Sequence, residues 1–240
     1  MEKLEADIVI VGTGASGLFA ALHVPSDKKV IMLTKSDAEN SDSFLAQGGI
    51  CVLRDKNDFD SFMEDTMKAG HYENRKESVE IMINSSRDII NELIGYGVDF
   101  ATKDGKLDYT REGAHSKPRI LFHEDITGKE ITSTLLDAVR KLENVTIMEY
   151  VTMTDIIEKD NVCYGVLAND ANNNEMCIEA GYTIFACGGI GGLYAHSTNY
   201  PHLTGDAIAI AIQHGIKLEN VDYVQIHPTT LYTKKRGRAF

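Results

Sequence analysis

The sequence predicts an α/β fold with a partly parallel sheet and an inserted β-meander. Three observations support this fold class. A β-branched apolar run, Asp7 to Val11, leads directly into a glycine-rich turn and an Ala/Leu-rich segment. Strand and helix patterns then alternate along the chain, which is typical of a parallel sheet. Further along, the turn residues Asp170 to Asn174 separate two strand patterns that follow each other closely.

The glycine-rich turn reads Gly12-x-Gly14-x-x-Gly17 and is the most informative motif of the chain. Its place between a strand and a helix is the context that a Rossmann-like dinucleotide-binding fold requires. Gly12 allows the tight turn, Gly14 lets the backbone approach a pyrophosphate, and Gly17 lets the helix pack against the strand. The helix N-terminus would then face the phosphates. The alternative is a strand-to-helix turn that contains its glycines by chance.

The second strand lacks the acid that a nicotinamide site needs. An acidic residue about 20 residues past the glycines normally holds a ribose hydroxyl of NAD. Here the strand ends at Thr34-Lys35, and Asp37 and Glu39 lie slightly too far along the chain. This departure argues against a plain NAD dehydrogenase and leaves FAD as a candidate cofactor.

The remaining elements follow from hydrophobic periodicity and from helix and turn signals. Residues 35–57 are rich in Ser, Asp, Asn and Gly and are expected to form a loop. Gly95 and Gly97 would stop one helix, and the Thr127-x-x-Glu130 pattern is a capping box that would open another. Helices are predicted over residues 15–24, 58–69, 76–95, 127–142 and 205–214. Strands are predicted over residues 6–11, 29–34, 145–149, 151–158, 162–168, 182–187 and 221–226, with short strands between 98 and 124.

Composition and charge disfavour several classes of function. The 240 residues are 43% hydrophobic, enough for a sizeable core, and their formal net charge of −12 disfavours nucleic acid, whose phosphates need a basic face. The four cysteines form no CxxC pair and the histidines show no metal-ligand spacing. We therefore expect no metal site, and reduced thiols in a cytoplasmic protein. We see no signal peptide and no apolar stretch long enough for a membrane span.

Five motifs occur in one order along the chain: Gly12 to Gly17, Ala46 to Ile50, Thr110 to Ser116, Gly205-Asp206 and His227-Pro228-Thr229. Together they resemble the FAD-binding part of the L-aspartate oxidase family, within the succinate dehydrogenase/fumarate reductase flavoprotein superfamily. The resemblance covers essentially all 240 residues and implies one FAD-binding domain over residues 1–240. Family members continue into a capping domain and a C-terminal helical domain. The resemblance therefore implies a fragment, truncated before the capping domain and inactive by itself.

The resemblance also assigns FAD-binding positions, residue by residue. Lys35 corresponds to a lysine at the adenosine end of FAD, and Asp206 to an acid near the ribityl-diphosphate region. Thr152 and Met153 correspond to a strand pair whose backbone touches the adenine. The phosphate turn comprises Gly12, Thr13, Gly14, Ala15, Ser16 and Gly17. The loop along the flavin comprises Asp42, Ser43, Phe44, Leu45, Ala46, Gln47, Gly48 and Gly49.

Two positions, Asp42 and Glu112, bear on the choice within the superfamily, and a third, His227, bears on substrate binding. Covalently flavinylated members carry a histidine five positions before the Gln of the Gln-Gly-Gly segment, where this chain has Asp42, so the resemblance implies non-covalent FAD. Glu112 is expected to pair with the α-amino group of the substrate, a charge-assisted contact that succinate could not make. His227 corresponds to a histidine that contacts a substrate carboxylate. The alternatives are a solvated carboxylate at Glu112 and a buried histidine beside Pro228.

The resemblance implies flavin-dependent oxidation of L-aspartate to iminoaspartate in de novo NAD biosynthesis, with electrons passing to dioxygen or fumarate. Quinolinate synthase, which uses iminoaspartate, is a candidate partner. Two alternatives stay open. One is a flavoprotein of the fumarate reductase or succinate dehydrogenase type, against which Asp42 and Glu112 count. The other is an FAD-binding module that folds but does not turn over.

Overall fold

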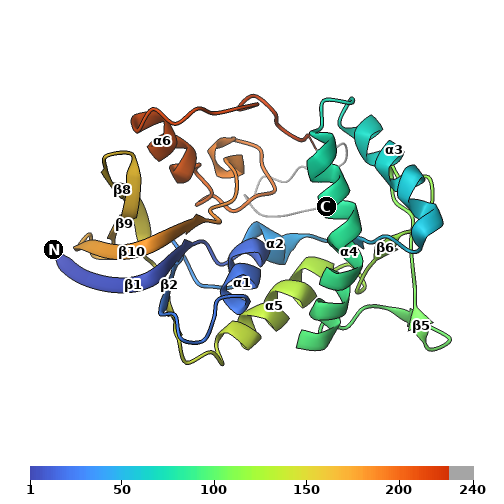
Figure 1. Cartoon of the computed structure of the whole chain (residues 1–240), viewed down its shortest axis with the longest axis horizontal. Coiled ribbons are helices and arrows are strands. Elements are labelled where there is room, and N and C mark those ends of the chain that lie inside the picture. The colour runs from blue at the N-terminus through green and yellow to red at the C-terminus, as the bar shows by residue number, and fades with distance from the viewer. Residues whose placement is uncertain (227–240) are drawn as a thin grey trace. The chain divides into compact units, whose positions relative to one another are not determined.

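The computed structural model describes residues 1–226, and the chain divides into two compact units. Unit 1 comprises residues 1–42 and the chain from residue 138 onward, and unit 2 comprises residues 43–137. The helices α2 (Asp42–Leu45) and α5 (Thr127–Val139) carry the chain from one unit to the other (Figure 1). Each unit is described by itself below, and a single domain over residues 1–240 stays a prediction.

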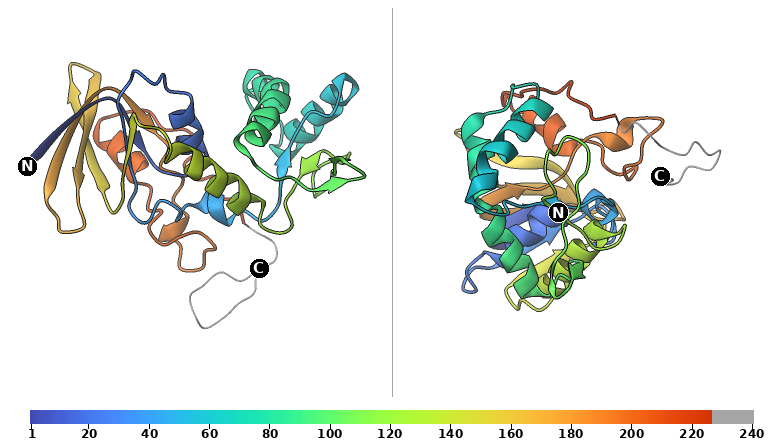
Figure 2. Two further views of the ribbon diagram at one scale, coloured as in Figure 1. Left: turned by 90° about the horizontal axis from the view of Figure 1, so that it is seen from below. Right: turned by 90° about the vertical axis from the view of Figure 1, so that its right-hand side faces the viewer.

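Unit 1 is built on a six-stranded sheet with the order β7-β2-β1-β10-β9-β8. Its strands are β1 (Glu2–Val11), β2 (Val30–Leu33), β7 (Val145–Met148), β8 (Thr152–Lys159), β9 (Val162–Asn169) and β10 (Glu175–Phe185). Its helices are α1 (Ala15–Leu22), the 3-10 helix η2 (Gly191–Leu193) and α6 (Asp206–Gln213). The pairs β1–β2, β2–β7 and β1–β10 are parallel, whereas β8, β9 and β10 form an antiparallel meander (Figure 2). The predicted fold class is confirmed.

The prediction of a strand over 182–187 was wrong in its length. Strand β10 begins at Glu175, and its first part pairs with β9 while the whole strand pairs with β1, from Glu2 opposite Met176 to Val11 opposite Phe185. Strand β1 is correspondingly longer than the predicted 6–11. Charged residues occupy the exposed positions in the first half of β1, so the apolar run that indicates a strand is interrupted there. One strand thus belongs to both the meander and the parallel sheet.

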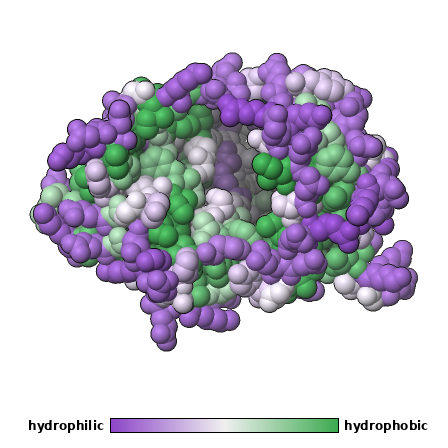
Figure 3. All heavy atoms as spheres, viewed as in Figure 1, coloured by the Kyte–Doolittle hydropathy of each residue, from purple (hydrophilic) through white to green (hydrophobic). Residues whose placement is uncertain are grey.

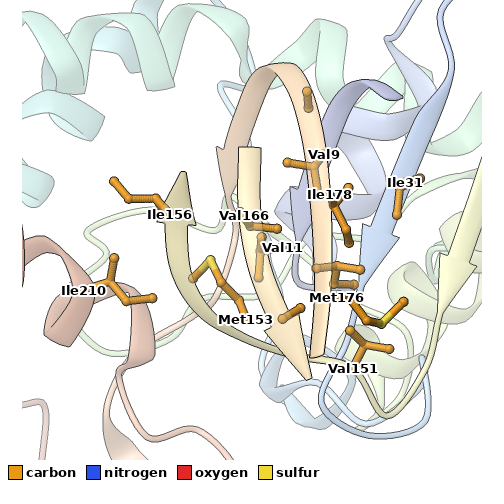
Figure 4. Packing of buried hydrophobic residues seen from close by; sticks show 13 residues of the cluster. Val9, Val11, Ile31, Val151, Met153, Ile156, Val166, Met176, Ile178 and Ile210 are labelled. Atoms are coloured by element: carbon orange, nitrogen blue, oxygen red, sulfur yellow. The ribbon is translucent and has the colours of Figure 1, made fainter. Parts of the chain in front are cut away.

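The core of unit 1 lies on one face of this sheet. Val9 and Val11 of β1 pack with Ile178 of β10, and Ile210 of α6 covers the same cluster (Figure 4). Side chains alternate along a strand, so Ile10 points to the face opposite that of Val9 and Val11. Ile10 and Leu18 of α1 are both fully buried. The sheet is therefore covered by apolar side chains on both faces.

Apolar surface remains exposed at the end of the described chain. Figure 3 shows hydrophobic surface around α6, where Ile212 is 63% exposed. A strand predicted over residues 221–226 is wrong, since these residues form a turn and irregular structure, and Ile226 is 84% exposed. A strand needs a neighbour for its backbone hydrogen bonds, and within residues 1–226 no other strand pairs with this segment.

Unit 2 contains helices α3 (Phe59–Ala69) and α4 (Lys76–Tyr96), most of α5, and two pairs of short strands. Both α3 and α4 agree closely with the predicted ranges, and the 3-10 helix η1 (Lys56–Asp58) precedes α3. Gly97, with φ of +108°, caps α4 in the left-handed region, so it stops the helix as predicted while Gly95 lies inside it. The short strands are β3 (Ile50–Cys51), β4 (Thr102–Lys103), β5 (Lys106–Leu107) and β6 (Ile120–Leu121), and β3 pairs with β6 and β4 with β5.

The predicted capping box at Thr127 and Glu130 was wrong, although a helix does begin at Thr127. The Thr127 hydroxyl accepts a hydrogen bond from the backbone N–H of His123 at 3.0 Å and donates to the carbonyl of Gly48 at 2.7 Å. The Glu130 carboxylate accepts from the N–H of Asp99 at 2.9 Å. Both side chains are therefore used for tertiary contacts within unit 2, which local sequence spacing could not reveal.

A buried charge cluster stabilises unit 2. The fully buried Arg119 donates to Asp58 through Nε at 3.1 Å and Nη2 at 2.9 Å, and to Asp65 through Nη1 at 2.5 Å. Its guanidinium also lies over the ring of Phe62, 4.9 Å from the centroid. Burial raises the pKa of Asp58, but hydrogen bonds from Arg119 and Ser61 and the guanidinium charge outweigh it and lower this pKa to about 2.

This pKa predicts acid sensitivity in unit 2. A lowered pKa stabilises the fold above the unfolded-state pKa of 3.8, and this contribution disappears as the pH falls toward 2. We expect Asp58→Asn to lower the free energy of unfolding at pH 7 by at least roughly 2 kcal/mol, a difference that narrows below pH 4. Urea unfolding at steps from pH 7 to pH 2 measures it, with Asp60→Asn, an exposed neighbour in α3, as the control. Parallel stability curves for Asp58→Asn and wild type would contradict the assignment.

Candidate cofactor and substrate site

The glycine turn after β1 brings three backbone segments into contact. Gly12 has φ of +116°, and a Cβ at this position would lie 2.1 Å from the carbonyl oxygen of Ala186. A Cβ at Gly17 would lie 2.1 Å from the carbonyl oxygen of Gly12. The N–H of Gly12 donates to Leu33 at 2.8 Å, which ties the turn to β2. The geometry at Gly12 and Gly17 is thus the one that the sequence motif requires.

The other residues of this turn divide into buried and accessible positions. Thr13 is buried, and its hydroxyl donates to the carbonyl of Ala38 at 3.0 Å, so this side chain holds the segment that follows β2. Gly14 is the N-cap residue of α1 and carries no side chain, while Ala15 is half-buried and Ser16 is exposed. The backbone at the start of α1 is therefore not covered by the side chain of its own cap residue, which suits a phosphate ligand.

Lys35 and Asp206, two positions assigned separately from the sequence, lie together. The Lys35 ammonium donates to Oδ2 of Asp206 at 2.7 Å and to the hydroxyl of Thr204 at 2.7 Å. The Thr204 hydroxyl in turn donates to Oδ1 of Asp206 at 2.7 Å. Both charged side chains are about a quarter exposed, at 27% and 28%. Asp206 begins α6, where the helix dipole also favours a carboxylate.

Asp42, which stands where a flavin-linking histidine would stand, has partners in unit 1. Its Oδ1 accepts from the N–H of Tyr200 at 3.0 Å, and its Oδ2 accepts from the side-chain amide of Asn199. A carboxylate engaged in this way fastens the segment around residue 200 to the start of α2. It offers no imidazole nitrogen for a covalent bond to a flavin.

The later part of the predicted flavin loop, which runs over residues 42–49, is held by two residues that the sequence did not assign to the site. The hydroxyl of Thr127 donates to Gly48, and the N–H of Gly128 donates to Ala46 at 2.8 Å. A Cβ at Gly128 would lie 2.1 Å from the carbonyl oxygen of Ser43. The available signal was a Thr-Gly pair at a helix start, which a capping motif explained equally well. Residues 46–49 themselves are exposed.

Glu112 lies against this loop. A Cβ at Gly48 would lie 3.3 Å from Oε2 and 3.4 Å from Oε1 of Glu112, so the carboxylate is in contact range of the loop backbone. Glu112 is otherwise exposed to solvent. His227, the second residue expected to touch substrate, lies outside the described residues.

Thr152 and Met153 begin β8 and pair with Asn169 and Ala168 of β9. Met153 is 3% exposed and its side chain belongs to the core of unit 1. Any adenine contact at this position would have to come from the backbone, as the sequence comparison implied. That contact stays a prediction.

The thiol of Cys187, whose titration is influenced by the charges of Asp206 and Lys35, is not suited to nucleophilic chemistry. Burial, assisted by the charge of Asp206, raises the pKa of Cys187 to about 11. This thiol is therefore protonated at neutral pH. Within residues 1–226, no cluster of three His, Cys, Asp or Glu side chains could hold a metal ion. In the same part of the chain, every helix is too short or too polar to cross a membrane.

A strand, a glycine turn and a helix with an accessible N-terminus define a dinucleotide-binding protein. A family model described as an FAD binding domain matches residues 7–240, and the chain therefore belongs to the FAD binding domain family. Its cofactor is FAD. The turn after β1 fits this cofactor, because Gly14, the N-cap residue of α1, has no side chain that could cover the backbone N–H groups at the start of this helix.

Curated relatives narrow the class further. The chain is 44% identical to L-aspartate oxidase of Clostridium perfringens over 233 residues, which are 97% of this chain and 53% of the relative. It is 45% identical to L-aspartate oxidase of Clostridium acetobutylicum over 231 residues, 96% of this chain and 53% of the relative. The chain spans about half the length of these relatives.

A solved structure shows the same fold. The FrdA chain of quinol fumarate reductase from E. coli superposes with a TM-score of 0.84 and is 25% identical. The match covers 89% of this chain and 38% of that chain.

The packing at Gly128 yields a prediction with an unusual sign. Alanine normally favours a helix over glycine by about 1 kcal/mol. Here a Cβ would lie 2.1 Å from Ser43 and 2.7 Å from Ala46, both backbone oxygens. We expect Gly128→Ala to lower the free energy of unfolding by about 1–3 kcal/mol and to weaken FAD binding.

Urea unfolding and FAD titration measure these two effects. Gly95→Ala is the matched control, because Gly95 lies inside α4 and no described atom lies within 4 Å of a Cβ at this position. A stabilised Gly128→Ala protein with unchanged FAD affinity would show that the loop is not held as described.

Proposed function

We propose that this chain is the FAD-binding part of an L-aspartate oxidase. The proposed reaction is the oxidation of L-aspartate to iminoaspartate in de novo NAD biosynthesis, with dioxygen or fumarate as the final electron acceptor. The single observation that carries the proposal is the Glu112 carboxylate in contact range of Gly48. The relatives named L-aspartate oxidase support it independently.

Glu112 is suited to recognise the group that distinguishes aspartate from succinate. An exposed carboxylate beside the flavin loop can accept a hydrogen bond from the substrate α-ammonium, and such charge-assisted bonds are roughly twice as strong as neutral ones. The contact would fix the α-carbon relative to the loop, so that orientation is set before bond breaking. FAD, when bound, supplies the acceptor for the hydride that leaves the α-carbon.

His227 is proposed to donate a hydrogen bond to a substrate carboxylate. The support is the His227-Pro228-Thr229 motif and its order relative to the other four motifs. Lys35 and Asp206 are proposed to contact FAD along its adenosine and ribityl-diphosphate parts. Their ion pair neutralises a carboxylate that would otherwise repel a diphosphate.

A flavoprotein of the fumarate reductase type is the second candidate, and the likeness to the E. coli FrdA chain favours it. Glu112 counts against it, because succinate has no ammonium group with which this carboxylate could pair. Quinolinate synthase is proposed as the consumer of the product. We propose a cytoplasmic location, supported by four free cysteines, which are typical of a reducing compartment.

The first test concerns how FAD is held. Asp42 carries a carboxylate already bonded to Tyr200 and Asn199, so we expect FAD to be bound non-covalently. Acid precipitation of the yellow holoprotein should release all flavin absorbance into the supernatant. Flavin retained in the washed pellet would overturn the expectation.

The second test separates the two candidate functions. In the complete protein as its gene encodes it, Glu112→Gln should lower kcat/KM for aspartate roughly 10- to 100-fold, the equivalent of one lost hydrogen bond to a charged group. Fumarate reduction should change much less, because fumarate has no ammonium. Anaerobic stopped-flow of both half-reactions measures this, with Glu77→Gln, an exposed glutamate of α4, as the control. Equal losses in both half-reactions would mean that Glu112 does not recognise the ammonium.

A further inference from the structure

The segment that carries Glu112 is a closed loop with two anchored ends. At its base, Thr110 and Ile120 exchange backbone hydrogen bonds of 2.9 and 3.1 Å. Between them, residues 111–114 are exposed, and Glu112 is one of these. The position of Glu112 therefore depends on what holds the other half of the loop, residues 115–119.

One carboxylate oxygen makes three of the contacts that hold that half, beside the bonds from Arg119 to Asp58. Oδ2 of Asp65, in α3, accepts from the N–H of Ser116 at 2.7 Å, from its hydroxyl at 2.8 Å, and from Nη1 of Arg119 at 2.5 Å. Burial raises the pKa of Asp65, but the bonds from Ser116 and Arg119 outweigh this and lower it. Asp65 is thus ionised at neutral pH and fastens the loop to a helix.

The same cluster reaches the strand that follows the flavin loop. Nη1 of Arg119 lies 3.1 Å from Nδ1 of His115, so this nitrogen accepts and the proton of the neutral ring sits on Nε2. Nε2 lies 3.6 Å from Sγ of Cys51, in β3. Burial and the Arg119 charge lower the pKa of His115, which favours this neutral form. The carbonyl of Arg119 also accepts from the N–H of Val52 at 2.9 Å.

We propose that Asp65 and Arg119 are positioning residues for Glu112, and through it for recognition of the substrate ammonium. They hold the Glu112 loop and the strand after Gly49 in one cluster. This cluster thereby fixes the distance between the Glu112 carboxylate and the backbone of the flavin loop at Gly48. This inference rests on the proposed function, because it assigns the cluster a role in substrate specificity in addition to stability.

A buried cluster of this kind makes the proposal testable by a small change. Asp65→Asn keeps the shape of the side chain but removes the charge that attracts three donors to one oxygen. Ser116→Ala removes only the hydroxyl bond and leaves the Arg119 pairs intact. Glu64→Gln is the matched control, because Glu64 precedes Asp65 in α3 and bonds to Tyr72 at 2.6 Å, away from the loop.

The first readout is the order of the loop itself. Trypsin can cleave after the exposed Arg111, whereas cleavage after Lys117 is blocked by Pro118. We expect Asp65→Asn to speed cleavage at Arg111 roughly tenfold, with a smaller increase in Ser116→Ala and none in Glu64→Gln. Cleavage after Arg87, in the middle of α4 of unit 2, requires that helix to open, so its rate reports unfolding of unit 2 and should stay at the wild-type value. An unchanged rate at Arg111 would overturn the proposal.

The second readout is substrate selectivity in the complete holoenzyme. We expect Asp65→Asn to raise KM for aspartate roughly tenfold with little change in kcat, in fumarate reduction or in FAD affinity. Ser116→Ala should shift KM in the same direction. If Asp65→Asn fails to fold, Ser116→Ala alone tests the positioning role. Losses of equal size in both half-reactions would show a purely structural role. If Glu112→Gln is selective and these variants are not, the positioning role fails while the proposed function stands; if Glu112→Gln is unselective, the proposed function fails first.

Discussion

Unit 1 depends on how closely three backbone segments approach at the end of β1. Gly12 meets the carbonyl of Ala186 on one side and donates to Leu33 on the other, and Gly17 packs directly on Gly12. A side chain at either glycine would separate β10, β2 and α1. Because these contacts are made by backbone, the surface beside them is left free of side chains, which is where a diphosphate needs to lie.

Unit 2 is stabilised by a different kind of interaction, a cluster of buried charges. Its apolar cluster around Phe62 and Ile83 is small, and Arg119 beside it is fully buried with two carboxylates. Removing one partner from such a cluster costs more than an exposed ion pair would, since the remaining charge stays out of water. The proposed substrate-binding loop at Glu112 is thus held in place by ionised side chains, whereas the proposed phosphate-binding turn at Gly12 is held in place by backbone contacts. The two kinds of support respond to different conditions, because only the first depends on ionised carboxylates.

The sequence correctly predicted those features that depend on residues close together along the chain. The turn at Gly12, helices α3 and α4 and the stop at Gly97 follow from spacing and from φ above zero. Long-range pairing was predicted poorly: β10 extends back to Glu175, and Thr127 bonds to Gly48 rather than to its own helix. Arg119 carried no signal at all, because its partners Asp58 and Asp65 are brought to it only by folding. The strand expected at 221–226 failed for the same reason, since no neighbour for it occurs among the described residues.

The pairing of β1 with β10 has a consequence for biosynthesis. Glu2 lies opposite Met176, so β1 leaves the ribosome well before β10, the strand with which it pairs. At about 5–20 residues per second, that delay is on the order of ten seconds or more. During it, β1 offers one open edge whose apolar half, Ile8 to Val11, can pair with other chains. The first half of β1 carries the charged residues Glu2, Lys3 and Glu5, which reduce that hazard. These residues therefore protect the chain during synthesis as well as forming part of the folded sheet.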